Sequence, residues 1–298
     1  MSSRSGPSTT PGREPSASAG REPSTAIRTG PALTPAVEWR RQLGRPRTRW
    51  VLVVLLTLPL VVVAAFTLGE ESDGSGARFS DLATLGSANF TVFMLFVTAE
   101  LLLLILAALF VGDPIPSEAS WSSLRYLLTA PVPRARLLTS KLLVGLGSTV
   151  AAMLLLLCWV LLVGGVAYGW APLTVPAGGV LEWSVLVPRL AVAAAYILVG
   201  LLPFAAIAFW MGVRTDAPLA AVGVAVLAAI VSSILGALDA LGQWRRGLPN
   251  YYAREWLDLF AGRADYAVLL PGVLWSSLWT VAFLALAYRH FARKDVLS

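Results

Sequence analysis

The stretch from Trp50 to Leu68 reads WVLVVLLTLPLVVVAAFTL and contains no charged side chain. Its apolar residues run without interruption and do not alternate with polar ones, so they fit neither a half-buried strand nor one strand of a membrane barrel. A helix rises about 1.5 Å per residue, and the hydrocarbon of a bilayer is about 30 Å thick, so about 20 apolar residues suffice to cross it. We therefore expect this stretch to be a membrane-spanning helix.

Five further runs of similar character follow along the chain, at residues 90–111, 142–168, 190–213, 218–238 and 267–288. Hydrophobic residues make up 57% of the chain and charged residues 13%, which is too apolar for a soluble domain to bury. In lipid every backbone N–H and C=O must be bonded within the protein, which favours helices for such runs. The sequence thus predicts an all-α polytopic membrane protein with six transmembrane helices.

The chain before the first span divides into two parts. Residues 1–35 are rich in Ser, Pro, Thr and Gly, have almost no large apolar residues and are expected to be a disordered tail, whereas residues 36–298 form the membrane domain. The start of that domain is basic and predicts an interfacial helix, with Trp39 and Leu43 facing lipid and Arg45 and Arg47 near anionic headgroups.

The distribution of Lys and Arg predicts the orientation. Seventeen lie in residues 1–49, the second-to-third and fourth-to-fifth loops and the C-terminus, and six lie on the other side. Loops rich in Lys and Arg stay in the cytoplasm, so we expect a multi-pass protein of the plasma membrane with both termini cytoplasmic. Topology explains the net charge of +6 better than nucleic-acid binding does, so lipids and not nucleic acid are expected to contact the basic segments.

The spacing of apolar residues predicts a short amphipathic helix in the loop between the second and third spans, residues 112–141. Ser117 is expected to cap it with Glu118 in its first turn, so that it covers residues 117–129 on the cytoplasmic side. Its apolar residues recur at spacings of three and four, at Trp121, Leu124, Leu127 and Leu128. Prolines then end the helix at Pro131 and Pro133, and Arg134 returns to the headgroup region.

Glu100 is the one acidic residue inside an expected span. An ionised carboxylate near the middle of a bilayer costs about 2.5 to 3.5 kcal/mol on insertion scales, so we expect its side chain to face polar groups inside the bundle. It could line a substrate path, bind a proton or serve as a hydrogen-bonded structural residue, and the sequence leaves these alternatives open.

The sequence lacks the residues that several kinds of metal, nucleotide and catalytic site require. His290 is the single histidine, which disfavours a metal site built on several imidazoles, and no Gly-x-x-x-x-Gly-Lys-Ser/Thr run is present to hold the phosphates of ATP. A nucleophile with a base and an orienting group cannot be assembled either. We expect no cofactor, no metal and no enzymatic activity in this chain.

The 112–141 loop resembles the permease subunits of type-2, exporter-like ABC transporters. These carry a stretch reading roughly Gly-Asp-x-x-x-x-Glu, then Gly-Thr-Leu-Arg-Tyr-Leu-Leu, then Pro-Val-x-Arg and Leu-Leu-x-x-Lys. The chain matches it at Gly112, Asp113, Glu118, Leu124, Arg125, Tyr126, Leu127, Leu128, Pro131, Val132, Arg134, Leu137, Leu138 and Lys141. It departs from the pattern at Ser122 and Ser123. The six-span layout and the Phe-x-Arg-Lys-Asp ending that starts at Phe291 are also similar, over about residues 36 to 298.

This resemblance implies a transport subunit, by family analogy an exporter, that works with separate ATP-binding subunits and with a second copy or a related permease. The residues it assigns to ATPase coupling are Glu118, Leu124, Arg125, Leu128, Pro131 and Arg134. The opposing hypothesis is a stand-alone membrane protein, either a scaffold or assembly factor or an ion-coupled carrier that uses Glu100. A neighbouring gene for a soluble ATPase with a P-loop would separate the two.

Overall fold

The computed structural model describes residues 39–68 apart from Arg41 and Leu43, and residues 79–120, 134–175, 178–261 and 264–293. All of these belong to one compact unit, Ala32–Ser298. The expected tail of residues 1–35 and most of the helix expected over residues 117–129 lie outside the described residues.

Membrane-spanning helices dominate the part of the chain that the structure describes. Five are long and apolar enough to cross a membrane singly, and α4 with α5 adds a sixth if that bent pair is counted as one span. The spans are α2 (Pro46–Leu68), α4 (Ser87–Ala99) with α5 (Leu102–Gly112), α8 (Arg134–Tyr168), α9 (Trp183–Arg214), α10 (Pro218–Gly236) and α11 (Leu269–Arg293). The expected all-α polytopic membrane fold is confirmed.

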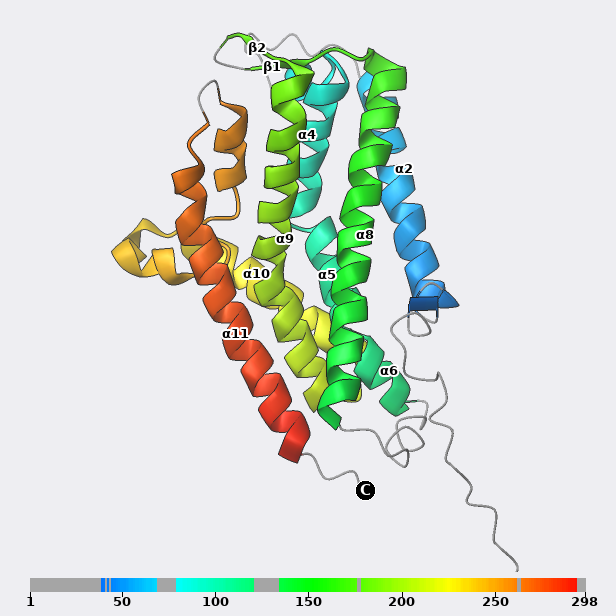
Figure 1. Ribbon diagram of the computed structural model, residues 1–298, viewed down its shortest axis with the longest axis vertical. Coiled ribbons are helices and arrows are strands. Elements are labelled where there is room, and N and C mark those ends of the chain that lie inside the picture. The colour runs from blue at the N-terminus through cyan, green and yellow to red at the C-terminus, as the bar shows by residue number, and fades with distance from the viewer. Residues whose placement is uncertain are drawn as a thin grey trace, which may run out of the picture. The chain divides into compact units, whose positions relative to one another are not determined.

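The spans alternate in direction through the bundle (Figure 1). We call the end where α8 begins, α9 ends and α11 ends the lower end, and the opposite end, which carries two short strands, the upper end. Helix α9 is the most buried of the five single-helix spans, and it packs mainly against α11, α5 and α10. Helix α4, by contrast, packs mainly against α8.

Two spans extend well beyond their apolar runs. Helix α8 begins at Arg134, eight residues before the expected start at Leu142, and α9 begins at Trp183, seven before Leu190. Hydropathy reports which residues favour lipid, whereas the helical hydrogen-bond ladder continues into water until a residue interrupts it. Pro133 precedes α8 directly, where a proline is expected to limit a helix from the N-terminal side.

The second span is broken. Helices α4 and α5 meet at an angle of 54°, with Glu100 and Leu101 forming the turn between them. Leu101 has φ −121° and ψ −59°, outside helical geometry. Kinks of this size usually contain Pro or Gly, and neither residue is present here, so contacts with other parts of the bundle must hold the bend.

The upper end contains elements that hydropathy did not predict. A two-stranded antiparallel hairpin joins β1 (Leu173–Thr174) to β2 (Val180–Leu181), and Asn89 of α4 holds it through bonds to both the N–H and the C=O of Thr174, each 2.9 Å long. A short helix, α3 (Phe79–Ala83), precedes α4.

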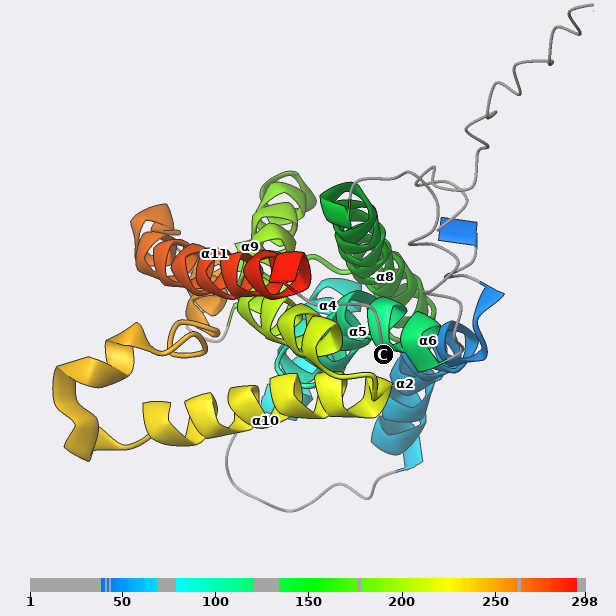
Figure 2. The same cartoon turned by 90° about the horizontal axis from the view of Figure 1, so that it is seen from below.

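The connection from α10 to α11 is a folded excursion rather than a simple loop. It contains the 3₁₀ segments η2 (Asp239–Gly247), η3 (Glu255–Phe260) and η4 (Tyr266–Val268). Seen from below, α10 runs across one side of the bundle, and the excursion leads from its far end back toward α11 (Figure 2).

Candidate functional site

Asp113 lies at the lower end, at the junction between α5 and the short helix α6 (Pro114–Ser120). The two prolines of this junction, Pro114 and Pro116, occupy the first turn of α6, where backbone N–H groups have no partner within the helix, so a proline costs nothing there. The expectation that Ser117 caps the helix is therefore wrong. The helix begins three residues earlier, and the Ser117 hydroxyl instead donates to the Asp113 carboxylate at 2.8 Å.

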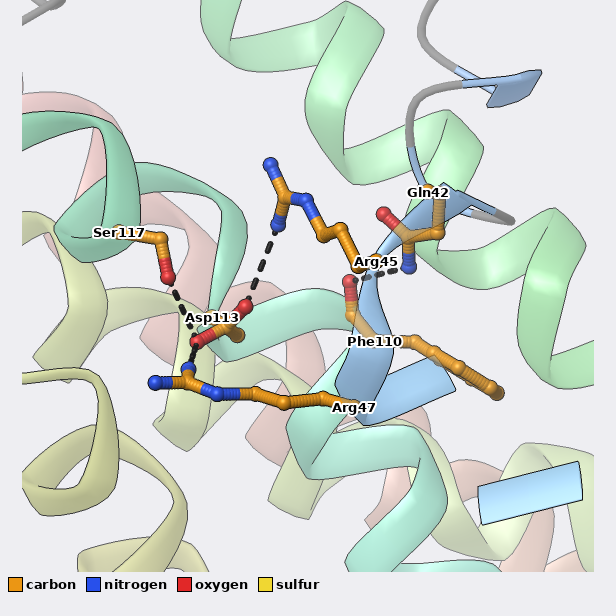
Figure 3. A network of polar contacts seen from close by, with 6 residues as sticks. All are labelled: Gln42, Arg45, Arg47, Phe110, Asp113 and Ser117. Atoms are coloured by element: carbon orange, nitrogen blue, oxygen red, sulfur yellow. Dashed lines mark hydrogen bonds and ion pairs between the residues drawn. The ribbon is translucent and has the colours of Figure 1, made fainter. Parts of the chain in front are cut away.

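Two arginines at the start of the first span also reach Asp113, Arg45 just before α2 and Arg47 in its first turn (Figure 3). Arg45 Nη1 lies 3.2 Å from Oδ2, and Arg47 Nη1 pairs with Oδ1. Nearby, the Gln42 side chain donates to the backbone oxygen of Phe110 at 3.3 Å. These contacts join the chain segment that enters α2 to the end of the second span, 66 to 68 residues further on.

The electrostatics of this cluster follow from its burial. The Asp113 side chain is 6% exposed, whereas those of Arg45 and Arg47 are 21% and 48% exposed. A buried carboxylate is costly unless it is both paired and hydrogen-bonded, and here two guanidinium groups and one hydroxyl meet that requirement. The arginines keep part of their hydration, so the cluster loses less solvation than a fully buried pair would.

The structure gives this entry segment protein partners that the sequence did not predict. The Trp39 ring packs against α8, where a Cβ added at Gly147 would lie 2.7 Å from its Cζ3 atom. Arg45 and Arg47 bind Asp113 rather than pointing away from the protein. A buried carboxylate is a stronger partner for a guanidinium than a hydrated headgroup is, because water screens the latter.

The residues expected to contact an ATPase lie mostly beyond the described part of the chain. Leu124, Arg125, Leu128 and Pro131 are outside it. Glu118 lies in α6 and Arg134 opens α8, but their side chains are not among those described. What the structure does place is the stem of this loop, because α6, which follows Asp113, and the start of α8 both lie at the lower end (Figure 1).

Glu100 occupies the break in the second span rather than the middle of a straight helix. Its carboxylate forms a two-pronged ion pair with Arg254, which directly precedes η3: Oε1 pairs with Nε, and Oε2 lies 2.9 Å from Nη2. The Glu100 side chain is 35% exposed and that of Arg254 63%. This hydrogen bond, ahead of the simple charge attraction, raises the pKa of Arg254 above its usual value.

Sequence reasoning missed four members of these clusters. Asp113 was noted only as a match to a family pattern, Arg45 and Arg47 were assigned to lipid, and Arg254 was counted only among the positive charges on the other side. The Arg-Pro-Arg spacing at the start of α2 and the lone acidic residue at the end of a span were the available signals, but neither says which segment meets which. Within the described ranges no group of three or more His, Cys, Asp or Glu side chains is arranged to hold a metal ion.

The Asp113 cluster joins three parts of the chain. One buried charge ties the entry segment, the end of the second span and the start of α6 together. Comparison with known proteins identifies a family whose matched region includes this cluster. The family model described as ABC-2 family transporter protein matches residues 43–232, a stretch that includes Arg45, Asp113 and the whole loop after α6. A search of curated proteins gave no match.

Proposed function

Because this chain belongs to the ABC-2 transporter family and is a permease of an ABC transporter, we propose that it forms the substrate pathway of an exporter driven by separate ATP-binding subunits. Two copies, or this chain and a related permease, would complete the pathway. ATP binding and hydrolysis are assigned to the partner, since the chain has no P-loop of its own.

The observation that carries the proposal is the Asp113 cluster. A permease driven by a soluble ATPase needs a rigid connection between the surface that the ATPase touches and the spans that move. Asp113 provides it, because its carboxylate bonds both to Ser117 in α6 and to the arginines that lead into α2. A scaffold or an ion-coupled carrier has no comparable need for a buried charge at the stem of a surface loop.

The lower end is proposed to face the cytoplasm, with both termini on that side. Seventeen of the 23 Lys and Arg residues are assigned to that face, and a cytoplasmic ATPase has access only there. The contact itself is assigned to α6 and the residues that follow it, up to about residue 129. Within this stretch and the return to α8, the side chains that would meet the ATPase are those of Glu118, Leu124, Arg125, Leu128, Pro131 and Arg134.

Copurification tests the assignment. The permease is coexpressed with the candidate ATP-binding subunit, extracted in mild detergent at matched expression, and the recovered ATPase is quantified for the wild type and for Leu124→Asp. A carboxylate buried without a partner costs about 1 to 3 kcal/mol, and about 1.4 kcal/mol corresponds to a tenfold change in binding. The Leu124→Asp variant should therefore recover about one tenth of the wild-type amount of ATPase, or less.

The matched control is Leu85→Asp. Leu85 is an exposed leucine between α3 and α4 at the opposite end of the bundle, so the same chemical change there should leave recovery unchanged. Equal recovery of the ATPase with Leu124→Asp and with the wild type would refute the coupling assignment.

A further inference from the structure

A seam runs through the upper half of the bundle at the break in the second span. Above the break, α4 packs mainly against α8 and α3, whereas below it α5 packs mainly against α9, α8 and α10. The excursion between α10 and α11 approaches α4 across this seam, through residues 254–261. The seam therefore separates α4 and its neighbours from the excursion and the spans that hold it.

Hydrogen bonds to α9, α10 and α11 hold the excursion in place. Tyr196 of α9 donates to the backbone oxygen of Tyr252 at 2.8 Å, Trp279 of α11 donates to that of Gly247 at 2.8 Å, and Ser232 of α10 accepts the N–H of Asn250 at 3.2 Å. Further along, Arg189 of α9 donates to the backbone oxygen of Leu259 at 2.8 Å. It follows that the excursion moves with α9, α10 and α11.

Packing across the seam is incomplete. A cavity of about 310 Å³ lies between α4, the hairpin and the residues around η3. It is lined by Leu82, Ala83, Asn89, Val92, Phe93, Leu173, Thr174, Val175, Leu257, Phe260 and Ala261. This space is partly open to the outside, and the side chains that face it have no partner across it, so the contact between α4 and the excursion contributes little dispersion energy here. A second cavity of about 30 Å³ adjoins Glu100 and Tyr252.

The Glu100–Arg254 pair crosses this seam at its base. The guanidinium is bonded twice to the carboxylate, and its carbon atom lies 5.4 Å from the centre of the Phe96 ring, one turn earlier on α4. Both contacts attach the excursion to the second span. The two charged side chains are partly exposed, so protein atoms enclose neither partner fully, and the pair can open and close without unpacking the core of the bundle.

We propose that the Glu100–Arg254 ion pair is a latch that holds the seam between α4 and residues 254–261 closed, and that its release opens the upper half of the bundle. The bend at Glu100 is the hinge, since the helical ladder is already interrupted there. The further claim, that this opening is a step of transport, rests on the proposed function. The latch itself does not, and it can be measured without ATP or a partner.

The first experiment measures access to the seam. Cys158 is replaced by Ser, and Ala99→Cys is introduced next to Glu100, where the side chain is 7% exposed and lines the smaller cavity. Labelling by a small water-soluble maleimide is followed in nanodiscs. The rate should rise at least tenfold in Glu100→Gln and in Arg254→Gln, and the exchanged pair Glu100→Arg with Arg254→Glu should lower it again.

Two controls keep this result specific. Arg245→Gln breaks the other ion pair of the excursion, with Asp239, and should leave the labelling rate unchanged because that pair does not touch α4. A cysteine at Ala193, which is fully buried in α9, should stay unlabelled in every variant and so excludes general unfolding. Equal labelling of Ala99→Cys in the wild type, Glu100→Gln and Arg254→Gln would overturn the latch.

The second experiment asks whether the transport cycle uses the latch. Labelling of Ala99→Cys is compared with and without ATP in the presence of the ATP-binding subunit, and turnover should accelerate it in the wild type. An unchanged rate in a complex that hydrolyses ATP would remove the latch from the cycle. Failure of the ATPase to bind at all would instead count against the proposed function and would leave the first experiment's result standing.

Discussion

Gly112 and Gly212 bring the backbones of α5 and α9 into direct contact at the lower end of the bundle. A Cβ added at Gly212 would lie 2.4 Å from the backbone oxygen of Gly112, and one added at Gly112 would lie 2.8 Å from the Cβ of Ala208. Real Cβ atoms do not approach a backbone oxygen so closely, so only glycine permits this crossing. Asp113 follows Gly112 directly, and the crossing thus positions the carboxylate on which the arginines converge.

We expect Gly212→Ala to destabilise the protein, because the obstructing atom belongs to the backbone and cannot rotate away. Overpacking of this kind costs about 1 to 3 kcal/mol. Gly200→Ala in the same helix is the control, since nothing lies within 4 Å of a Cβ added there and alanine favours a helix over glycine by about 1 kcal/mol. Thermal unfolding in detergent should rank Gly200→Ala at or above the wild type and Gly212→Ala below it, and the opposite order would contradict the close crossing.

Replacing Asp113 by Asn should weaken both folding and coupling. The substitution keeps the shape of the side chain but leaves Arg45 and Arg47 without their shared negative charge, and we expect a loss of about 1 to 3 kcal/mol, less than for a fully buried pair because the arginines are partly hydrated. Unfolding temperature and ATPase copurification report the two effects. Asp239→Asn removes a carboxylate that is 91% exposed and should change neither.

The orientation can be read with two cysteines in a Cys158→Ser background. Thr84 is exposed at the upper end and Ala217 at the lower end, between α9 and α10. With intact cells, an impermeant thiol reagent should label Thr84→Cys, whereas Ala217→Cys should require permeabilised cells, because the Lys-rich and Arg-rich side stays in the cytoplasm. The reverse labelling pattern would invert the proposed topology.

The raised pKa of the Glu255 carboxyl should make the stability of the protein depend on pH. Burial within η3, and then the neighbouring charge of Asp258, raise the pKa of this carboxyl above its ordinary value of 4.5. A raised pKa in the folded state means that the stabilising contribution is present below pH 4.5 and is lost as the pH rises through the folded-state pKa. Glu255→Gln should therefore unfold at a higher temperature than the wild type at pH 7, and the difference should vanish near pH 4. A difference independent of pH would show that burial of the charge is not its cause.

Sequence reasoning reached the membrane fold and the six runs that become spans, since each run favours lipid by its own composition. Helices α8 and α9 begin eight and seven residues before the apolar runs that predict them, because a helix can continue beyond the hydrocarbon. Sequence reasoning also assigned Ser117 the role of a cap. In the structure α6 begins at Pro114, and the N–H of Ser117 already bonds back to the carbonyl of Asp113, so Ser117 lies inside this helix.

The sequence by itself determined that this protein crosses a membrane with helices, because the free energy of moving a segment into lipid is a local sum over its own residues. It did not determine which charges meet. Asp113 pairs with arginines 66 and 68 residues earlier, and Glu100 with an arginine 154 residues later. Such partners, like the crossing at Gly112 and Gly212 and the bend held at Glu100, depend on how whole helices pack, and packing is decided by the shapes of all surfaces together rather than by any local pattern.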